Sequence, residues 1–168
     1  SALEMAKGYA TIKNDGGYRN PTCIIKITDA DGQVLYQADQ TASVVYKENA
    51  CRQMTDMLQT VITSGTGRGY SLGNMPCAGK TGTTNDNKDG WFVGYTPYYT
   101  TSVWVGYDIP KEVPGLGGGT YPGKIWYSFM SWLHEGLEPI DFVHPLDQTL
   151  TDLGQTDTTE NALPETGE

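Results

Sequence analysis

The chain has 168 residues, of which 38% are hydrophobic and 18% are charged, a composition typical of one globular domain. The formal net charge is -9, but seven acidic residues and no Lys or Arg lie between residues 141 and 168. The remaining 140 residues carry thirteen acids and eleven bases, so the part predicted to fold is nearly neutral. The absence of a basic stripe excludes a typical nucleic-acid-binding protein. The sequence contains no apolar run of about twenty residues that would predict a membrane-spanning helix.

The N-terminal half shows two helical patterns around a β-rich segment. Apolar residues at helical spacing predict a helix over residues 3–12, which a Gly-rich turn ends. Two β-rich segments follow at residues 22–28 and 33–36, and residues 29–32 between them have the composition of a hairpin turn. A second helix is predicted over residues 47–63 with one apolar stripe. The stripe consists of Met54, Met57, Leu58, Val61 and Ile62.

The C-terminal half predicts a sheet followed by a helix. Strands are expected at residues 76–84, 90–96 and 100–107, and their connections are short enough to force antiparallel pairing. A Gly-rich stretch at residues 115–119 is predicted to be a flexible loop, and a helix is predicted over residues 123–135. The side chains expected to face inward from this helix are Ile125, Trp126, Phe129, Met130 and Leu133. The predicted fold class is therefore α+β, an antiparallel sheet with packed helices.

The last residues of the chain have a different composition. From residue 148 onward the sequence is rich in Thr, Asp and Gln, so we predict a domain over residues 1–147 and a disordered acidic tail over residues 148–168. Residues 163–167 (LPETG) resemble the pentapeptide that sortases recognise. We assign this pentapeptide no role in the fold.

The Cys, His and Asp residues of this sequence do not have the spacing expected of a metal site or of an acid–base catalytic pair. Cys23, Cys51 and Cys77 are widely spaced and form no Cys-x-x-Cys pair, so we predict three small buried apolar side chains. His134 and His144 have no partner at metal-ligand or triad spacing and are predicted to serve packing or surface roles. Asp86 and Asp89 are predicted to shape a turn between strands. No metal or organic cofactor is expected.

The stretch that indicates chemistry is Lys80-Thr81-Gly82 followed by Thr83 and Thr84. A Lys-Thr-Gly triplet alone is weak evidence, since it occurs by chance in about one chain in fifty of this length. Here it lies on a predicted strand whose small residues allow another backbone to approach closely. A strand with an open edge can bind an extended peptide through its main chain. One ammonium and neighbouring hydroxyls would then suit the peptide's terminal carboxylate.

Residues 80–89 (KTGTTNDNKD) and 91–97 (WFVGYTP) resemble the third active-site motif and following strand of class A penicillin-binding proteins, the bifunctional peptidoglycan synthases. Further segments match this family in order and spacing over roughly residues 1–140. They are residues 3–6 (LEMA), 54–58 (MTDML), 64–69 (SGTGRG) and 103–108 (VWVGYD). The resemblance implies the C-terminal half of a penicillin-binding, β-lactamase-like transpeptidase fold.

The resemblance also implies a reaction and residue roles. A serine attacks the D-alanyl-D-alanine carbonyl of a peptidoglycan stem peptide, and an amine from a neighbouring stem resolves the acyl-enzyme; β-lactams acylate the same serine. Lys80, Thr81 and Thr83 would bind the substrate or drug carboxylate, with Thr84 beside them. The main-chain N–H of Thr83 would be one oxyanion-hole donor, and Gly82 would keep the strand clear. Trp91 is expected to pack under the strand.

The chain departs from the family pattern in its nucleophile. None of its serines is followed by Lys three positions later, and the Ser-x-Asn motif of the family is absent. We therefore expect an N-terminal segment of the same domain to supply both motifs, and we expect this chain alone to be inactive. The resemblance places the parent protein on the outer side of the cytoplasmic membrane, anchored by a segment that this chain lacks.

Two other interpretations of the Lys-Thr-Gly strand stay open at this point. One is a non-catalytic module that binds stem peptides or another protein through its open strand. The other is a piece of a serine β-lactamase, because that fold shares Lys-Thr-Gly. The pattern at residues 91–97 counts against the second interpretation.

Overall fold

The computed structural model describes residues 1–146, so the predicted tail at 148–168 and its LPETG segment lie outside the described residues. The helices are α1 (Ala2–Lys13), α2 (Glu48–Thr63) and α3 (Tyr121–Leu133). The strands are β1 (Gly17–Tyr18), β2 (Lys26–Thr28), β3 (Val34–Gln37), β4 (Ser43–Val44), β5 (Ala78–Thr83), β6 (Asp89–Tyr95) and β7 (Thr100–Gly106), with a short 3-10 turn, η1 (Asn85–Asn87). None of the helices in the described part has the length and apolar character needed to cross a bilayer.

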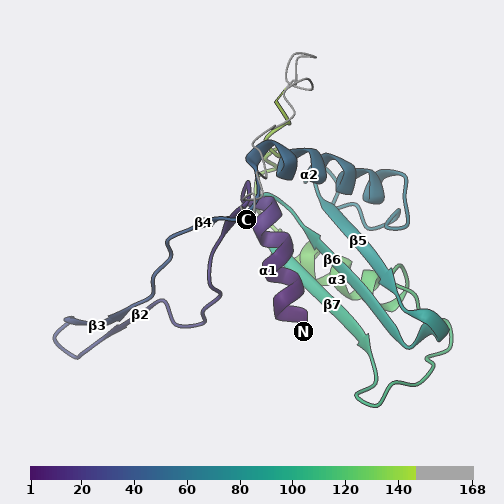
Figure 1. The fold of residues 1–168 in the computed structure, drawn as a ribbon, viewed down its shortest axis with the longest axis horizontal. Coiled ribbons are helices and arrows are strands. Elements are labelled where there is room, and N and C mark those ends of the chain that lie inside the picture. Colours follow the sequence, from purple (N-terminus) through teal and green to yellow (C-terminus); the bar gives the residue numbers. More distant parts are fainter. Residues whose placement is uncertain (147–168) are drawn as a thin grey trace, which may run out of the picture.

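A three-stranded antiparallel sheet in the order β5-β6-β7 is the centre of the fold (Figure 1). Helix α1 packs on one face of β6 and β7, where Tyr9 contacts Tyr95 edge-on. Helix α3 packs on the opposite face, where Trp126 lies against Phe92. Helix α2 contacts β5. The prediction of an α+β fold with helices on an antiparallel sheet is confirmed.

The core lies mainly between the sheet and α3. Its buried residues are Ile62, Cys77, Phe92, Trp126 and Met130. A smaller cluster on the α1 side consists of Leu58, Ala78 and Tyr95. Burial raises the pKa of Tyr95 to about 12, and its hydroxyl lies 2.9 Å from Thr55 Oγ1 on α2. This hydrogen bond ties α2 to the sheet beside β5.

For α2 and α3, the sequence predicted which apolar side chains face inward, and the structure confirms only some of them. On α3, Trp126 and Met130 are buried, but Ile125 is 51% exposed and Phe129 is 44% exposed. Positions 126 and 130 are one turn apart and face the sheet, whereas 125 and 129 form a second stripe about 100° around the helix. On α2, Leu58 and Ile62 are buried while Met54 and Met57 are exposed for the same reason.

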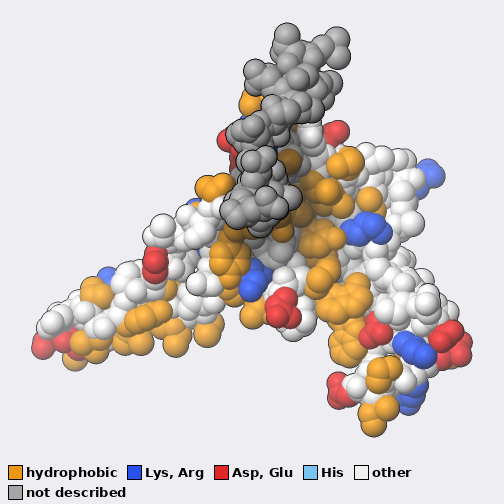
Figure 2. Space-filling model, in the orientation of Figure 1, with side chains coloured by type: hydrophobic (Ala, Val, Ile, Leu, Met, Phe, Trp, Pro, Cys, Tyr) orange, Lys and Arg blue, Asp and Glu red, His pale blue; other side chains and the backbone are white. Residues whose placement is uncertain are grey.

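Residues between β1 and β4 form an arm that extends away from the sheet (Figure 1). Its tip is the predicted hairpin of β2 and β3, with Gly32 at φ +84° in the turn. The carboxylate of Asp29 accepts hydrogen bonds from the N–H groups of Asp31 and Gln33, which fixes this turn. Hydrophobic side chains gather along one edge of the arm (Figure 2), and the exposed apolar residues of the arm include Ile25 and Leu35. The pairing of β1 with β4 was not predicted, because two-residue strands leave no periodic signal.

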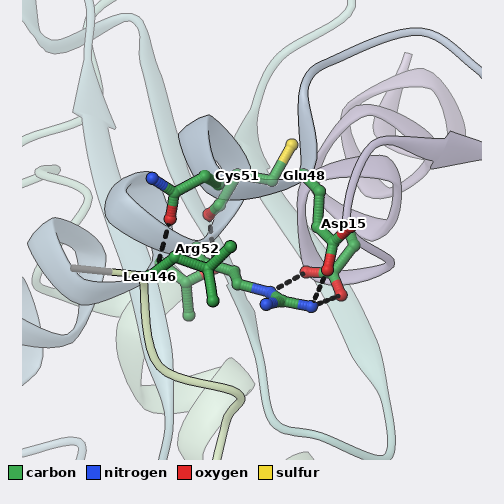
Figure 3. Close-up of polar contacts among 7 residues, drawn as sticks. Asp15, Glu48, Cys51, Arg52 and Leu146 are labelled. Atoms are coloured by element: carbon green, nitrogen blue, oxygen red, sulfur yellow. Dashed lines mark hydrogen bonds and ion pairs between the residues drawn. The ribbon is translucent and has the colours of Figure 1, made fainter. Parts of the chain in front are cut away.

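An ion pair joins the end of α1 to the start of α2 (Figure 3). The Arg52 guanidinium donates to both carboxylate oxygens of Asp15, at 3.2 and 2.9 Å, and also contacts Glu48. The bond to Asp15 raises the pKa of Arg52. Nearby, Asn49 Oδ1 accepts a hydrogen bond from the N–H of Leu146 at 2.7 Å. The ion pair connects the end of α1 to α2, and the bond from Leu146 connects the C-terminal segment of the described residues to α2.

The cysteines and histidines differ in their burial. Cys51 and Cys77 are buried as predicted, and burial raises the pKa of both thiols. The prediction is wrong for Cys23, which is exposed because the arm that carries it has no second layer. His134 is buried, with Nε2 2.8 Å from Thr96 Oγ1, and His144 is exposed. Within residues 1–146 no group of three or more His, Cys, Asp or Glu side chains could hold a metal ion.

Candidate active site

The Lys-Thr-Gly sequence lies on β5, the edge strand of the sheet. Glycines at 79 and 82 let this strand lie close to its neighbours: a Cβ at Gly79 would be 3.1 Å from the Val93 carbonyl oxygen, and one at Gly82 would be 3.2 Å from Trp91 Cβ. Such contacts are tighter than most side chains allow. These two glycines therefore allow close packing of β5 against β6, and the expectation that Gly82 keeps the strand clear for a substrate stays a prediction.

The pleat of β5 divides its side chains between two faces. Lys80 pairs with Val93 and Gly82 pairs with Trp91, so Lys80 shares the α1 face of the sheet with both partners. A hollow of about 500 Å³ lies on this face, between Met5 and Tyr9 of α1 and the strand. Burial raises the pKa of Tyr9 above its ordinary value. Lys80 is exposed at the hollow.

Trp91 lies elsewhere than the sequence indicated. It was expected under the strand, but its side chain is partly exposed and lines the same hollow as Lys80. Its cross-strand partner is Trp104, with ring centroids 6.4 Å apart. The indole N–H of Trp104 donates to Asp89 Oδ1 at 2.9 Å. Trp91 therefore forms part of the lining of the hollow beside Gly82, with Trp104 packed next to it.

The main chain of Thr81 and Thr83 faces the outer edge of β5. The N–H of Thr84 donates to the Asp89 carbonyl at 3.0 Å, which identifies that pair as hydrogen-bonded. Because antiparallel pairs alternate, Gly82 and Lys80 also bond to β6 while the residues between them point outward. The Lys80 ammonium reaches this edge and donates to the Thr81 carbonyl at 2.8 Å. Apart from the strand pairing with β6, none of the backbone hydrogen bonds among residues 1–146 uses the N–H of Thr83.

The hydroxyls of Thr81 and Thr83 lie on the face opposite Lys80. Thr83 Oγ1 accepts a hydrogen bond from the Gly118 N–H at 3.0 Å, which leaves its own proton available. Thr81 Oγ1 lies 2.6 Å from Thr66 Oγ1. An anion that contacts Lys80 and both hydroxyls must therefore lie at the outer edge, where the two faces of β5 meet.

The Gly-rich stretch at 115–119 is packed against this strand, contrary to the prediction of a flexible loop. Leu116 is buried, and a Cβ at Gly118 would lie 2.6 Å from the Gly82 nitrogen. Tyr70 further fixes the stretch, since its hydroxyl donates to the Gly119 carbonyl at 2.7 Å. The missing side chains allow this close approach, which composition alone cannot distinguish from flexibility.

The turn after β5 is shaped by the residues that the sequence assigned to it. Thr84 Oγ1 donates to Asp89 Oδ2 at 3.2 Å and accepts from the Asp89 N–H at 2.8 Å. Asp86 and Asn87 adopt left-handed φ values of 58° and 49°, which Asp and Asn tolerate better than most residues. Thr84 lines the hollow, but its hydroxyl is already bonded, so its role as a substrate ligand stays a prediction.

The electrostatics of the edge favour an anion. None of the ion pairs among residues 1–146 includes Lys80, so its charge is not neutralised by a described carboxylate. Sequence reasoning identified Lys80, Thr81 and Thr83 but missed Thr66 and Gly118. No local pattern links these two residues to β5, because their contacts span 15 and 35 positions of the chain.

Comparison with known proteins assigns this arrangement to a family. Residues 1–131 match the family described as "Penicillin binding protein transpeptidase domain". Penicillin-binding protein 1A of Neisseria meningitidis serogroup B is 40% identical over 142 residues, which cover 80% of this chain and 18% of that protein. Penicillin-binding protein 4 of Bacillus subtilis is 39% identical over 124 residues, covering 74% of this chain and 20% of that protein.

Solved structures agree with the sequence comparison. PonA1 of Mycobacterium tuberculosis, in complex with penicillin V, superposes with a TM-score of 0.76 at 34% identity, covering 87% of this chain and 41% of that chain. This chain thus spans about a fifth of the length of the curated relatives named above. The chain belongs to the transpeptidase-domain family of the penicillin-binding proteins, and within it to class A.

Proposed function

We propose that this chain supplies the Lys-Thr-Gly wall of a peptidoglycan D,D-transpeptidase, an enzyme that cross-links stem peptides by serine acyl transfer and binds β-lactams. One observation carries the proposal. An ammonium that no described carboxylate neutralises, two threonine hydroxyls on the opposite face of the strand and an outward-facing N–H all lie along the outer edge of β5. This set suits the terminal carboxylate and scissile carbonyl of an extended peptide.

Each residue then has a defined role. Lys80 attracts the carboxylate of the peptide or drug, and the hydroxyls of Thr81 and Thr83 donate hydrogen bonds to it. The N–H of Thr83 donates to the oxyanion that forms when the serine attacks the carbonyl. Gly82 leaves the space for the incoming backbone. No step of this chemistry requires a metal or an organic cofactor.

The nucleophile must come from outside this sequence. No serine here is followed by Lys at the third position, so a partner segment carrying Ser-x-x-Lys and Ser-x-Asn completes the site. The relation to class A penicillin-binding proteins supports an N-terminal part of the same domain as that segment. It also supports a location outside the cytoplasmic membrane, with the membrane anchor elsewhere in the parent protein.

Covalent labelling by a fluorescent penicillin tests the proposal. We expect no labelling of this chain alone and strong labelling when the segment with Ser-x-x-Lys is supplied. Lys80→Ala should then lower the acylation rate constant by about 10- to 150-fold, because it removes a charged hydrogen-bond donor. Lys124→Ala is the matched control, since Lys124 is also exposed but lies on α3 away from β5.

Two results would contradict the proposal. Labelling of this chain alone would reveal a nucleophile that the sequence does not indicate. Equal labelling of Lys80→Ala and Lys124→Ala would show that Lys80 on β5 does not take part in the reaction. Binding of a D-alanyl-D-alanine peptide that depends on Lys80, without labelling under any pairing, would instead favour a non-catalytic binding module.

A further inference from the structure

Thr66 lies beside the outer edge of β5, in the turn that follows α2. The turn is tight: the Gly67 N–H donates to the Val61 carbonyl at 3.0 Å. A Cβ at Gly65 would lie 2.8 Å from Val61 Cα, so the chain folds back directly on the helix. On its other side the carbonyl of Thr66 meets the Gly-rich stretch, where a Cβ at Gly119 would lie 2.9 Å from it. The position of Thr66 is therefore fixed from two directions.

The contact between Thr66 and Thr81 has two possible proton arrangements. Their Oγ1 atoms are 2.6 Å apart, and either hydroxyl can be the donor. If Thr81 donates to Thr66, Thr81 offers only lone pairs to the edge and repels an anion there. If Thr66 donates to Thr81, the proton of Thr81 is free for that anion. Within residues 1–146 the Thr66 hydroxyl has no other hydrogen-bond partner, so nothing described competes for its proton.

We propose that Thr66 is a positioning residue for the carboxylate site: it donates to Thr81 Oγ1 and thereby directs the Thr81 proton to the bound carboxylate. The inference rests on the proposed function, because the carboxylate is that of the stem peptide or β-lactam. Thr66 acts through Thr81 and does not itself contact the substrate. Its contribution is that of one neutral hydrogen bond.

The test uses this chain combined with the segment that carries Ser-x-x-Lys. The rate constant of acylation is measured with a penicillin that has a free carboxylate and with its methyl ester. For Thr66→Val we expect a loss of about three- to tenfold with the free acid and no change with the ester. Thr66→Ser should restore the rate. Thr63→Val is the matched control, because Thr63 is exposed in the same region and its hydroxyl bonds only to Thr60.

A double mutant isolates the coupling between the two hydroxyls. If Thr66 acts through Thr81, Thr66→Val adds no further loss to Thr81→Val. Independent, multiplicative losses would overturn the inference, as would an equal loss with the acid and the ester. Thermal unfolding of each variant shows whether a loss of rate accompanies a loss of stability, and a structural defect would lower the rates with the acid and with the ester alike.

The two proposals fail in different ways. If Lys80→Ala lowers acylation and Thr66→Val does not, only the role of Thr66 is wrong. If the combined protein is not acylated, or Lys80→Ala has no effect, the proposed function fails and the role of Thr66 fails with it.

Discussion

Replacing Gly118 by alanine tests whether the Gly-rich stretch supports the Lys-Thr-Gly strand. A Cβ at this position would lie 2.4 Å from the Trp91 carbonyl oxygen, 2.6 Å from the Gly82 nitrogen and 2.7 Å from the Gly82 oxygen. All three atoms belong to the main chain of paired strands and cannot rotate away. The stretch must therefore move off β5, and the bond from the Gly118 N–H to Thr83 is lost.

The expected cost follows from these two effects. Overpacking against a fixed backbone costs about 1–3 kcal/mol. Loss of one neutral hydrogen bond adds about 0.5–1.5 kcal/mol. We therefore expect Gly118→Ala to lower the free energy of unfolding by roughly 2–4 kcal/mol, which corresponds to a decrease in Tm of roughly 5–15 °C. Carboxylate binding at the edge should weaken as well, since Thr83 loses its support.

Gly117→Ala is the matched control for this experiment. A Cβ at Gly117 would be no closer than 3.8 Å to any neighbour, the nearest being Thr83 Oγ1. Its stability should stay within about 0.5 kcal/mol of the unmodified chain. Urea unfolding followed by tryptophan fluorescence measures both variants. If Gly118→Ala proves as stable as Gly117→Ala, the stretch does not pack as described and its supporting role is refuted.

Two further predictions concern buried groups. Because burial raises the pKa of Tyr95 to about 12, above the value of about 10 in the unfolded chain, the free energy of unfolding is unaffected below pH 10 and falls by about 2–3 kcal/mol as the pH rises to 12. In urea unfolding at pH 9–12, Tyr95→Phe should lack this part of the decrease in the free energy of unfolding. If the variant and the unmodified chain show the same pH dependence, the pKa of Tyr95 is not raised by folding. A thiol reagent should modify exposed Cys23 at once and Cys51 and Cys77 only on unfolding, whereas rapid modification of all three would contradict their burial.

The sequence predicted the main elements because each has a strong local signal. The strands from 76 to 107 are aromatic and β-branched, and their short links allow only antiparallel pairing. The Asp29 to Gly32 turn has a composition that forms hairpins, and the structure has a hairpin there. Lys80 was identified as a site residue from its motif, and the structure places it exposed on the edge strand.

Features that depend on distant contacts were missed. The periodicity of α3 shows that Ile125 and Trp126 are both apolar, but only the packing decides that Trp126 faces the sheet. The contact of Thr66 with Thr81 joins the turn after α2 to strand β5 through a single pair of hydroxyls and has no sequence signature. The close approach of Gly118 to Gly82 has no sequence signature either. The glycines at 115–119 predict a flexible segment, and only the position of the neighbouring strand shows that they are packed.

Consecutive side chains of β5 point to opposite faces of the sheet, and this arrangement affects how anion binding at the strand can be altered. Lys80 and Thr81 are consecutive residues on opposite faces of one strand, so the backbone sets only the directions in which their side chains leave the strand. The final positions of the ammonium and the hydroxyl depend on the contacts that each side chain makes, such as that of Thr81 with Thr66. Under the proposed function, graded weakening of anion binding with the motif intact is expected from the turns at residues 64–67 and 115–119, because these turns contact the hydroxyls of Thr81 and Thr83.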